Sequence, residues 1–420
     1  MILRYHEAAV NLDRWLTSKR LRAHALLLAI AVWGIYIWTI ATPGLRDRNG
    51  NLKGTDFLHF YTLGSLALAH SGNELYDMRS QALLAERRVP DARGIRYLPL
   101  YPPQVSLLFA PLAVFSYERA LTLWWLFTAV IYAACCYWTW QSCPALHRCG
   151  ATTALAALAF PAFFHLIAWG QTSAIALACF TVTFFLLRDQ REFAAGLVLG
   201  CVTFKPQLGL AAAILFIFLG NWRLVAGAAL SGAVQSAVGV LYYGTGPFRS
   251  WMDTMRHVPA RLASFEPKPY ETHCLRTFWS ILVPRSELSF GLYLVSSAVV
   301  LGWTIAIWKS QKPFSLKFSV LLLATVLVSP HLTIYDLVIL APAILLLTEW
   351  AISQGSTQGG IGSLLYAVYI LPLLGPCTHW THVQLSVIAM AILVYWIWRI
   401  AGKKHAATVP SGAHLGTVSQ

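Results

Sequence analysis

The sequence predicts an all-α polytopic membrane protein, a helical bundle of about 12 transmembrane helices. Of its 420 residues, 57% are hydrophobic and only 11% are charged, a composition far too apolar for a soluble protein of this length. The mean hydropathy is +0.59. We expect one membrane domain over residues 1–402, followed by a disordered cytoplasmic tail over residues 403–420.

Apolar runs long enough to cross a bilayer as helices recur along the whole chain. They lie near 23–42, 118–141, 151–168, 172–187, 222–243, 286–308, 315–329, 333–350, 360–376 and 381–400. Two shorter runs, 193–204 and 207–220, flank Lys205-Pro206. Because proline removes a helix hydrogen bond, we interpret this pair as a break between a descending and an ascending helix.

The distribution of Lys and Arg predicts the orientation, because short cytoplasmic loops are enriched in both. With the N-terminus inside, both termini are cytoplasmic and the short outer turns carry only Lys205. Two long outer loops remain, at about 43–117 and 244–285. In the first, 57–70 and 79–89 are expected to be short helices, and with the apolar segment Pro102 to Pro111 they are expected to lie in the membrane interface.

This orientation brings the unusual polar residues to the outer face. They are Asp56, Tyr101-Pro102-Pro103, Trp169-Gly170-Gln171, Lys205-Pro206-Gln207, His273 to Arg276, and Ser329-Pro330-His331.

Asp56 is the most informative of them. It is either an ordinary solvated charge or a base that takes a proton from a sugar hydroxyl. It begins a helix-like run that Thr55 is placed to cap, so the helix dipole is expected to favour its ionised form.

The other polar residues also allow two interpretations each. Lys205 either snorkels to the surface or supplies a point charge for a phosphate. His331 is a capping or core residue, or a second donor to that phosphate. Gln171 caps a helix or binds sugar hydroxyls. Asp336 is a buried acid or the partner of a neighbouring cation. In the second long loop, Arg276 is a better anion ligand than His273.

Several other functions are disfavoured. The net charge of +14 is spread among apolar segments, which favours retention beside anionic lipid over nucleic-acid binding. The eight cysteines contain no C-x-x-C pair, and we expect no metal site. The sequence also lacks a P-loop, G-x-G-x-x-G, H-E-x-x-H and G-x-S-x-G.

An ordered set of motifs resembles the GT87 (DUF2029) family of glycosyltransferases over roughly residues 20–400. The first outer loop carries Asp56-Phe57, Tyr61, Gly64, Leu75-Tyr76-Asp77, Tyr101-Pro102-Pro103 and Ala110-Pro111-Leu112. The later landmarks are Gly170-Gln171, Ala195-Gly196, Lys205-Pro206-Gln207, Ser329-Pro330-His331 and Tyr335-Asp336. Where relatives often have an Asn-Gln-Ser-Leu-type stretch, this chain has Glu271 to Arg276, which leaves acceptor recognition open.

The resemblance implies a GT-C-fold enzyme that works on the outer face of the cytoplasmic membrane. Its donor would be a polyprenyl-phosphate-linked sugar, typically mannose and in some members arabinofuranose, and its acceptor a lipid or glycan. Asp56 resembles the catalytic base, and Lys205 and His331 resemble donor-phosphate residues. Arg276 is added to the donor-phosphate candidates from its own chemistry and not from the resemblance. Gln171, Tyr101, His59 and His273 are the candidate substrate-binding residues. No cofactor is expected.

Two other functions stay open. The same polar cluster would suit a transporter or flippase for lipid-linked sugars, but such a protein should need polar features on both faces. The predicted cytoplasmic loops offer only short basic turns. A non-catalytic scaffold for cell-envelope assembly is the third alternative.

Overall fold

The computed structural model describes residues 16–265, 268–354 and 360–402, and over these residues the secondary structure is helical, with no strand assigned. The predicted tail, 403–420, lies outside the described residues. Every apolar run predicted above is helical. The bundle contains α2 (Ser18–Ile40), α6 (Tyr117–Gln141), α8 (Gly150–Leu158), α9 (Pro161–Trp169), α10 (Ser173–Arg188), α11 (Glu192–Gly200), η3 (Cys201–Phe204), α12 (Pro206–Leu219), α13 (Trp222–Tyr243), α16 (Ser286–Lys309), α17 (Phe314–Val328), η5 (Ile334–Leu340), α18 (Ala341–Ser353), α19 (Ile361–Ile370), η7 (Leu371–Cys377), α20 (Thr378–Thr381) and α21 (Leu385–Gly402).

The predicted count of about 12 membrane spans is not confirmed. Among the described residues, seven helices are long and apolar enough to cross a membrane, or eight if the bent pair α8–α9 forms one span. This pair bends by 42° just before Pro161, where the proline nitrogen cannot donate a helix hydrogen bond. The helices α10, α12 and α17, and α11 taken with η3, are apolar but shorter.

The break at Lys205-Pro206 is present and reverses the chain. Pro206 occupies the first turn of α12, a position that tolerates the missing N–H. The side-chain amide of Asn221, just after α12, donates to the carboxylate of Glu192 at the start of α11, 3.2 Å away. The beginning of α11 and the end of α12 therefore lie at the same end of the bundle, with Lys205 at the other.

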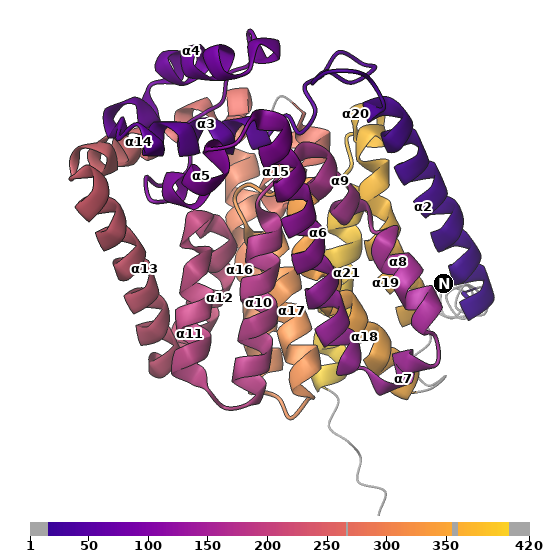
Figure 1. The fold of residues 1–420 in the computed structure, drawn as a ribbon. Coiled ribbons are helices and arrows are strands. Elements are labelled where there is room, and N and C mark those ends of the chain that lie inside the picture. Colours follow the sequence, from indigo (N-terminus) through magenta and orange to yellow (C-terminus); the bar gives the residue numbers. More distant parts are fainter. Residues whose placement is uncertain (1–15, 266–267, 355–359, 403–420) are drawn as a thin grey trace, which may run out of the picture.

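Short helices cover one end of the bundle, which we call the capped end (Figure 1). The first loop supplies η1 (Gly72–Tyr76), η2 (Pro90–Ala92), α3 (Phe57–Leu68), α4 (Met78–Arg88) and α5 (Val105–Ala113), and the second supplies α14 (Gly246–Phe265), η4 (Pro269–Glu271) and α15 (Leu275–Leu282). The helices expected at 57–70 and 79–89 are thus present, whereas α14 was not anticipated. Another short helix, α7 (Pro144–His147), lies at the opposite end.

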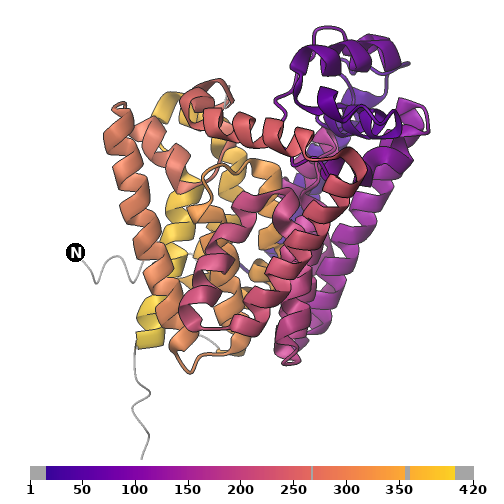
Figure 2. The same cartoon turned by 90° about the vertical axis from the view of Figure 1, so that its left-hand side faces the viewer.

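The turns that carry the basic residues gather at the end opposite the cap. The α10–α11, α12–α13 and α16–α17 connections all lie there (Figures 1 and 2). At the same end, the Arg188 guanidinium donates to Ser142 after α6 at 3.0 Å. The polar motifs and the basic turns are therefore separated by the length of the bundle, as the sequence predicts.

Small residues let α11 and α13 pack backbone to backbone. A Cβ on Gly196 would lie 2.0 Å from the carbonyl oxygen of Leu224, so no larger residue fits. Close approach of this kind is typical of helices that associate in lipid. This contact between α11 and α13 fixes the position of α11. Because Lys205 follows α11 and η3, the contact also helps to fix Lys205.

Candidate active site

Asp56 lies in the turn that leads into α3 and is tied to the end of α9. Its backbone N–H donates to the carbonyl oxygen of Trp169 at 2.9 Å. Gly170, directly after Trp169, has φ +71°, and a Cβ there would lie 2.6 Å from the Cβ of Phe57. Because only glycine combines this backbone conformation with this close approach, Gly170 allows the two segments to meet.

The carboxylate of Asp56 is partly buried and accepts a hydrogen bond from the side-chain amide of Gln171 at 2.6 Å. Burial raises the pKa of Asp56 to about 6, although this hydrogen bond and the charge of Lys205 act in the opposite direction. A carboxylate with such a pKa is mostly ionised at neutral pH and is a stronger base than a solvated one.

The predicted capping arrangement at Asp56 is wrong. The Thr55 hydroxyl donates to the carbonyl oxygen of Leu52, and Asp56 itself is the residue that precedes the first turn of α3. Its side chain caps no helix N–H. Burial, and not a cap hydrogen bond, is the largest influence on the pKa of Asp56.

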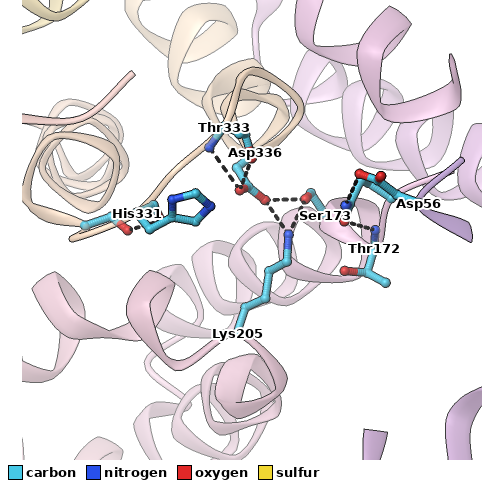
Figure 3. Close-up of polar contacts among 9 residues, drawn as sticks. Asp56, Thr172, Ser173, Lys205, His331, Thr333 and Asp336 are labelled. Atoms are coloured by element: carbon cyan, nitrogen blue, oxygen red, sulfur yellow. Dashed lines mark hydrogen bonds and ion pairs between the residues drawn. The ribbon is translucent and has the colours of Figure 1, made fainter. Parts of the chain in front are cut away.

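Lys205 is part of a buried ion pair rather than a surface cation. Its Nζ lies 2.8 Å from Oδ1 of Asp336, and the two side chains are 5% and 2% exposed. Nζ also donates to the Ser173 hydroxyl at 3.2 Å, and that hydroxyl donates to the same carboxylate oxygen (Figure 3). Snorkelling is thereby contradicted, and of the two interpretations of Asp336, pairing with a cation is confirmed.

Asp336 is held from its other side as well. The backbone N–H and hydroxyl of Thr333 both donate to Oδ2, at 3.4 and 3.3 Å. The Lys205 ammonium lies 4.9 Å from the centre of the Tyr335 ring. Of its three N–H groups, two have partners among the described residues, which leaves one for a ligand.

Asp56 and the ion pair belong to one polar chain. Gln171 contacts Asp56, and Ser173, two residues later, contacts both Lys205 and Asp336. Figure 3 shows Asp56 and His331 on opposite flanks of the pair. The turn between α9 and α10 therefore connects the carboxylate to the ammonium.

His331 and Arg276 lie beside each other, because their two segments pair. The backbone N–H of His273 donates to the carbonyl oxygen of Leu332 at 2.9 Å, and Thr272 and Thr333 form an isolated β-bridge. The Arg276 guanidinium donates to the carbonyl oxygen of Pro330. Both side chains are partly exposed. The predicted donor-phosphate residues thus come from three segments that meet at the capped end.

The remaining candidates differ in accessibility. Tyr101 is partly exposed, whereas Gln171 and His59 are 5% and 4% exposed. The His59 ring lies between Tyr97 and Tyr101, with centroid distances of 5.1 and 5.8 Å. His273 is 0% exposed, the least accessible of the four predicted substrate-binding residues. It bonds Ser386, at 2.7 Å.

Sequence reasoning missed Ser173, Thr333 and Glu271. The first two are ordinary helix-start residues, and only the fold shows that both contact Asp336. The charge of Glu271 acts on Asp56, raising its pKa further. The one available signal was the unusual stretch Glu271 to Arg276, which was noted for its departure from the family pattern.

Among the described residues, no group of three or more His, Cys, Asp or Glu side chains is arranged to hold a metal ion. The side chains that the described residues bring to the capped end include carboxylates, imidazoles, an ammonium, a guanidinium and aromatic rings.

No curated protein and no solved structure matches this chain. The sequence model of glycosyltransferase family 87 matches residues 100–330, which is more than half of the chain. The match includes Tyr101, Gln171, Lys205 and Arg276. Asp56 and Asp336 lie outside it, yet the fold brings both into contact with matched residues. Together with its apolar helices, the match identifies this protein as a membrane member of glycosyltransferase family 87.

Proposed function

We propose that this glycosyltransferase moves a sugar, mannose in the first instance, from a polyprenyl-phosphate donor to a hydroxyl of a lipid or glycan acceptor. The reaction is a single displacement that inverts the anomeric carbon, so a β-linked donor gives an α-linked product. It takes place at the capped end, on the outer face of the cytoplasmic membrane.

The proposed membrane arrangement has twelve crossings. The four shorter apolar helices, α10, α11 with η3, α12 and α17, add to the seven long spans and the bent pair. The basic turns at the opposite end support a cytoplasmic location for that end, since Lys and Arg favour the inner face. The cap helices α3, α4 and α5 would then lie in the outer interface, where a lipid-linked donor presents its phosphate.

Asp56 acts as the general base. It takes the proton of the acceptor hydroxyl as the oxygen forms its bond to the anomeric carbon. The support is its partial burial, a pKa of about 6 and the fixed contact with Gln171. A base with a pKa near the working pH combines a high ionised fraction with strong proton affinity.

The donor phosphate leaves with the electron pair of the broken bond between the anomeric carbon and the phosphate oxygen. We propose that the third N–H of Lys205 stabilises the negative charge on the departing phosphate. His331 and Arg276, whose side chains are partly exposed, would stabilise the same charge. Asp336 neutralises Lys205 between turnovers and holds the ammonium in place. Because the leaving group is a lipid monophosphate rather than a nucleotide diphosphate, this chemistry does not require a metal in principle.

The observation that carries the proposal is the polar chain from Asp56 through Gln171 and Ser173 to Lys205, in a chain of glycosyltransferase family 87. It supports a site in which Asp56 is the base and Lys205 the cation.

The test is reconstitution of the purified protein in proteoliposomes with radiolabelled polyprenyl-phosphate mannose or polyprenyl-phosphate arabinofuranose and a lipid extract. We expect a labelled α-mannosylated product. Transfer of arabinofuranose alone would change the sugar but retain the mechanism. Movement of the labelled donor between leaflets without transfer would contradict the proposal and support a flippase.

A further inference from the structure

A large cavity lies in the half of the bundle opposite the capped end, away from the candidate active site. Its volume is about 910 Å³, near the upper end of the usual range for ligand pockets, roughly 300–1,000 Å³. Its walls are α2 and α8 on one side and α18 and α19 on the other, with parts of α6 and α7 between them. These helices lie on one side of the bundle (Figure 1). We call this space the α2–α19 cavity.

The cavity has the depth of one lipid leaflet. On α2 its lining runs from Ser18 to Leu28, about 15 Å at 1.5 Å per residue, although the helix continues to Ile40. The hydrocarbon core of a bilayer is about 30 Å thick, so one leaflet accounts for about 15 Å. Towards the cap the cavity ends at Phe160, whose ring stacks on that of Tyr369 at a centroid distance of 5.5 Å. The cavity therefore reaches from the surface opposite the cap to about the middle of the membrane.

Polar side chains line the part of the cavity nearest that surface. The Ser18 hydroxyl lies 3.4 Å from the Thr152 hydroxyl and 3.6 Å from the Cys149 sulfur, where α2 and α8 begin. Further in, the Tyr366 hydroxyl lies 3.3 Å from Nδ1 of His24. This contact joins α19 to α2 across the cavity.

The deep part of the cavity is apolar. The hydroxyl groups of Tyr132 and Tyr369 donate to the carbonyl oxygens of Ala157 and Ala156, at 2.8 and 2.9 Å. Because α8 accepts both hydroxyl protons, these residues present their rings to the cavity. The change from a polar surface end to an apolar interior matches a lipid, whose head group lies at the surface and whose acyl chains extend inward.

Four exposed basic side chains border the surface end, each adjacent in sequence to a lining residue. They are Lys19, Arg20 and Arg22 on the first turns of α2, and Arg148 between α7 and α8. Glu349, an acid at the same end, already accepts hydrogen bonds from two backbone N–H groups of α7, both at 3.1 Å. The charge at this end therefore complements an anionic head group, because basic pockets between membrane helices attract anionic lipids.

We propose that the α2–α19 cavity binds the acyl chains of an anionic phospholipid from the leaflet opposite the cap, with its phosphate beside the four basic residues. In the orientation proposed above, this is the cytoplasmic leaflet. The lipid fills the space between α2 and α19. The buried residues of α2 are Ala25 and Ala29, so the helix packs lightly and gains contacts from the lipid.

The cavity suits the donor's polyprenyl tail less well. The donor phosphate is assigned to Lys205 at the capped end, whereas the basic residues of the cavity lie at the other end, and the stacked rings of Phe160 and Tyr369 close the cavity towards the cap. The lipid site is thus separate from the site of sugar transfer.

The first experiment measures head-group selectivity. The delipidated protein in mild detergent is titrated with phosphatidylglycerol or phosphatidylcholine of the same acyl chains and analysed by native mass spectrometry. We expect wild type to bind phosphatidylglycerol roughly 10- to 30-fold more tightly, since each nearby basic residue contributes about 5-fold. Arg22→Gln/Arg148→Gln should lose most of this preference. Arg223→Gln, at an exposed arginine that begins α13 at the same end of the bundle, should keep it.

The second experiment fills the cavity. Thr153→Phe from the α8 wall and Ala351→Phe from the α18 wall should each weaken phosphatidylglycerol binding by roughly 10-fold or more, because displacing about two methylene groups costs that much. Ala154→Phe, on the exposed face of α8, is the matched control and should bind as wild type. Phosphatidylglycerol should also raise the Tm of wild type and of Ala154→Phe, but not that of Thr153→Phe.

Four results would overturn the lipid site. They are equal affinity for the two phospholipids, unchanged binding by both cavity-filling variants, displacement of phosphatidylglycerol by polyprenyl phosphate, and binding that appears only after residues 2–15 are deleted. The third would assign the cavity to the donor tail, and the fourth would assign it to the chain's own N-terminal segment. If the cavity-filling variants do not fold, the surface variant Arg22→Gln/Arg148→Gln still decides the question. None of these measurements involves sugar transfer, so failure of the proposed function would leave them unaffected.

Discussion

Asp56 and Asp336 are two carboxylates in one polar chain, and their surroundings give them opposite roles. Asp336 is 2% exposed, bonds directly to the Lys205 ammonium and accepts further hydrogen bonds from Ser173 and Thr333. Asp56 is partly exposed and has a neutral amide, Gln171, as its close partner. One carboxylate is saturated with donors, and the other is not.

The difference shows what separates a structural acid from a reactive one. A carboxylate that is paired with a cation and accepts hydrogen bonds from several donors is held in place by those contacts. Asp56 lacks a direct cation, so burial dominates and its pKa rises to about 6. These surroundings support our proposal that Asp56 is the residue that takes the proton, whereas Asp336 pairs with Lys205.

The largest expected effect is on the structural acid. Asp336→Ala leaves the Lys205 ammonium buried without its partner, and removing one member of a buried ion pair typically costs about 3–5 kcal/mol in stability. Thermal unfolding in detergent should show a large loss. The double variant Lys205→Met/Asp336→Leu should recover most of it. Equal stability of Asp336→Ala and wild type would contradict a structural role for the Lys205–Asp336 ion pair.

The link between the two acids gives the next prediction. Gln171→Ala removes the hydrogen bond that lowers the pKa of Asp56, so more of the carboxylate is protonated at neutral pH. Losing a hydrogen bond to a charged group should reduce kcat/KM by about 10- to 150-fold. The pH–rate profile should also move to higher pH. A lower rate with an unmoved profile would assign Gln171 to substrate contact alone.

The smallest effect concerns stability and pH. The pKa of Asp56 in the folded state, about 6, lies above its ordinary value of 3.8, so the folded protein binds this proton more tightly than the unfolded chain. Ionised Asp56 therefore lowers stability above pH 6, and this cost disappears as pH falls towards 4. Asp56→Asn should be more stable than wild type at pH 8, by about 1–2 kcal/mol, with the difference vanishing near pH 4. A pH-independent difference would contradict the raised pKa.

The sequence predicts the convergence of these residues but not their contacts. Hydrophobic runs and the sorting of Lys and Arg suffice to bring Asp56, Lys205 and His331 to one end of the bundle. They do not reveal that Gln171 contacts Asp56 across 115 positions, or that Asp336 pairs with Lys205 across 131. Such contacts depend on how the helices rotate and pack against one another. For Asp56, the close approach of α9 to the start of α3 requires glycine at position 170.

The two local errors have different causes. Thr55 has the composition of a helix cap, but its hydroxyl turns back to Leu52 because the chain before α3 forms a tight turn. Tertiary structure, which local propensity does not capture, decides that case. The helix α14 was missed although the sequence carries a signal for it, because Phe248, Trp251, Met252 and Met255 recur at helical spacing.

The most direct test of Asp56 as the base compares Asp56→Asn with Asp253→Asn, which alters an exposed aspartate of α14, in the reconstituted enzyme. The amide has nearly the same shape but cannot take a proton. Asp56→Asn should lower turnover by about 10²–10⁴-fold, the usual contribution of a general base, with donor affinity unchanged. Asp253→Asn should behave as wild type. Near-normal transfer by Asp56→Asn, with the donor still bound, would contradict the assignment of Asp56 as the general base.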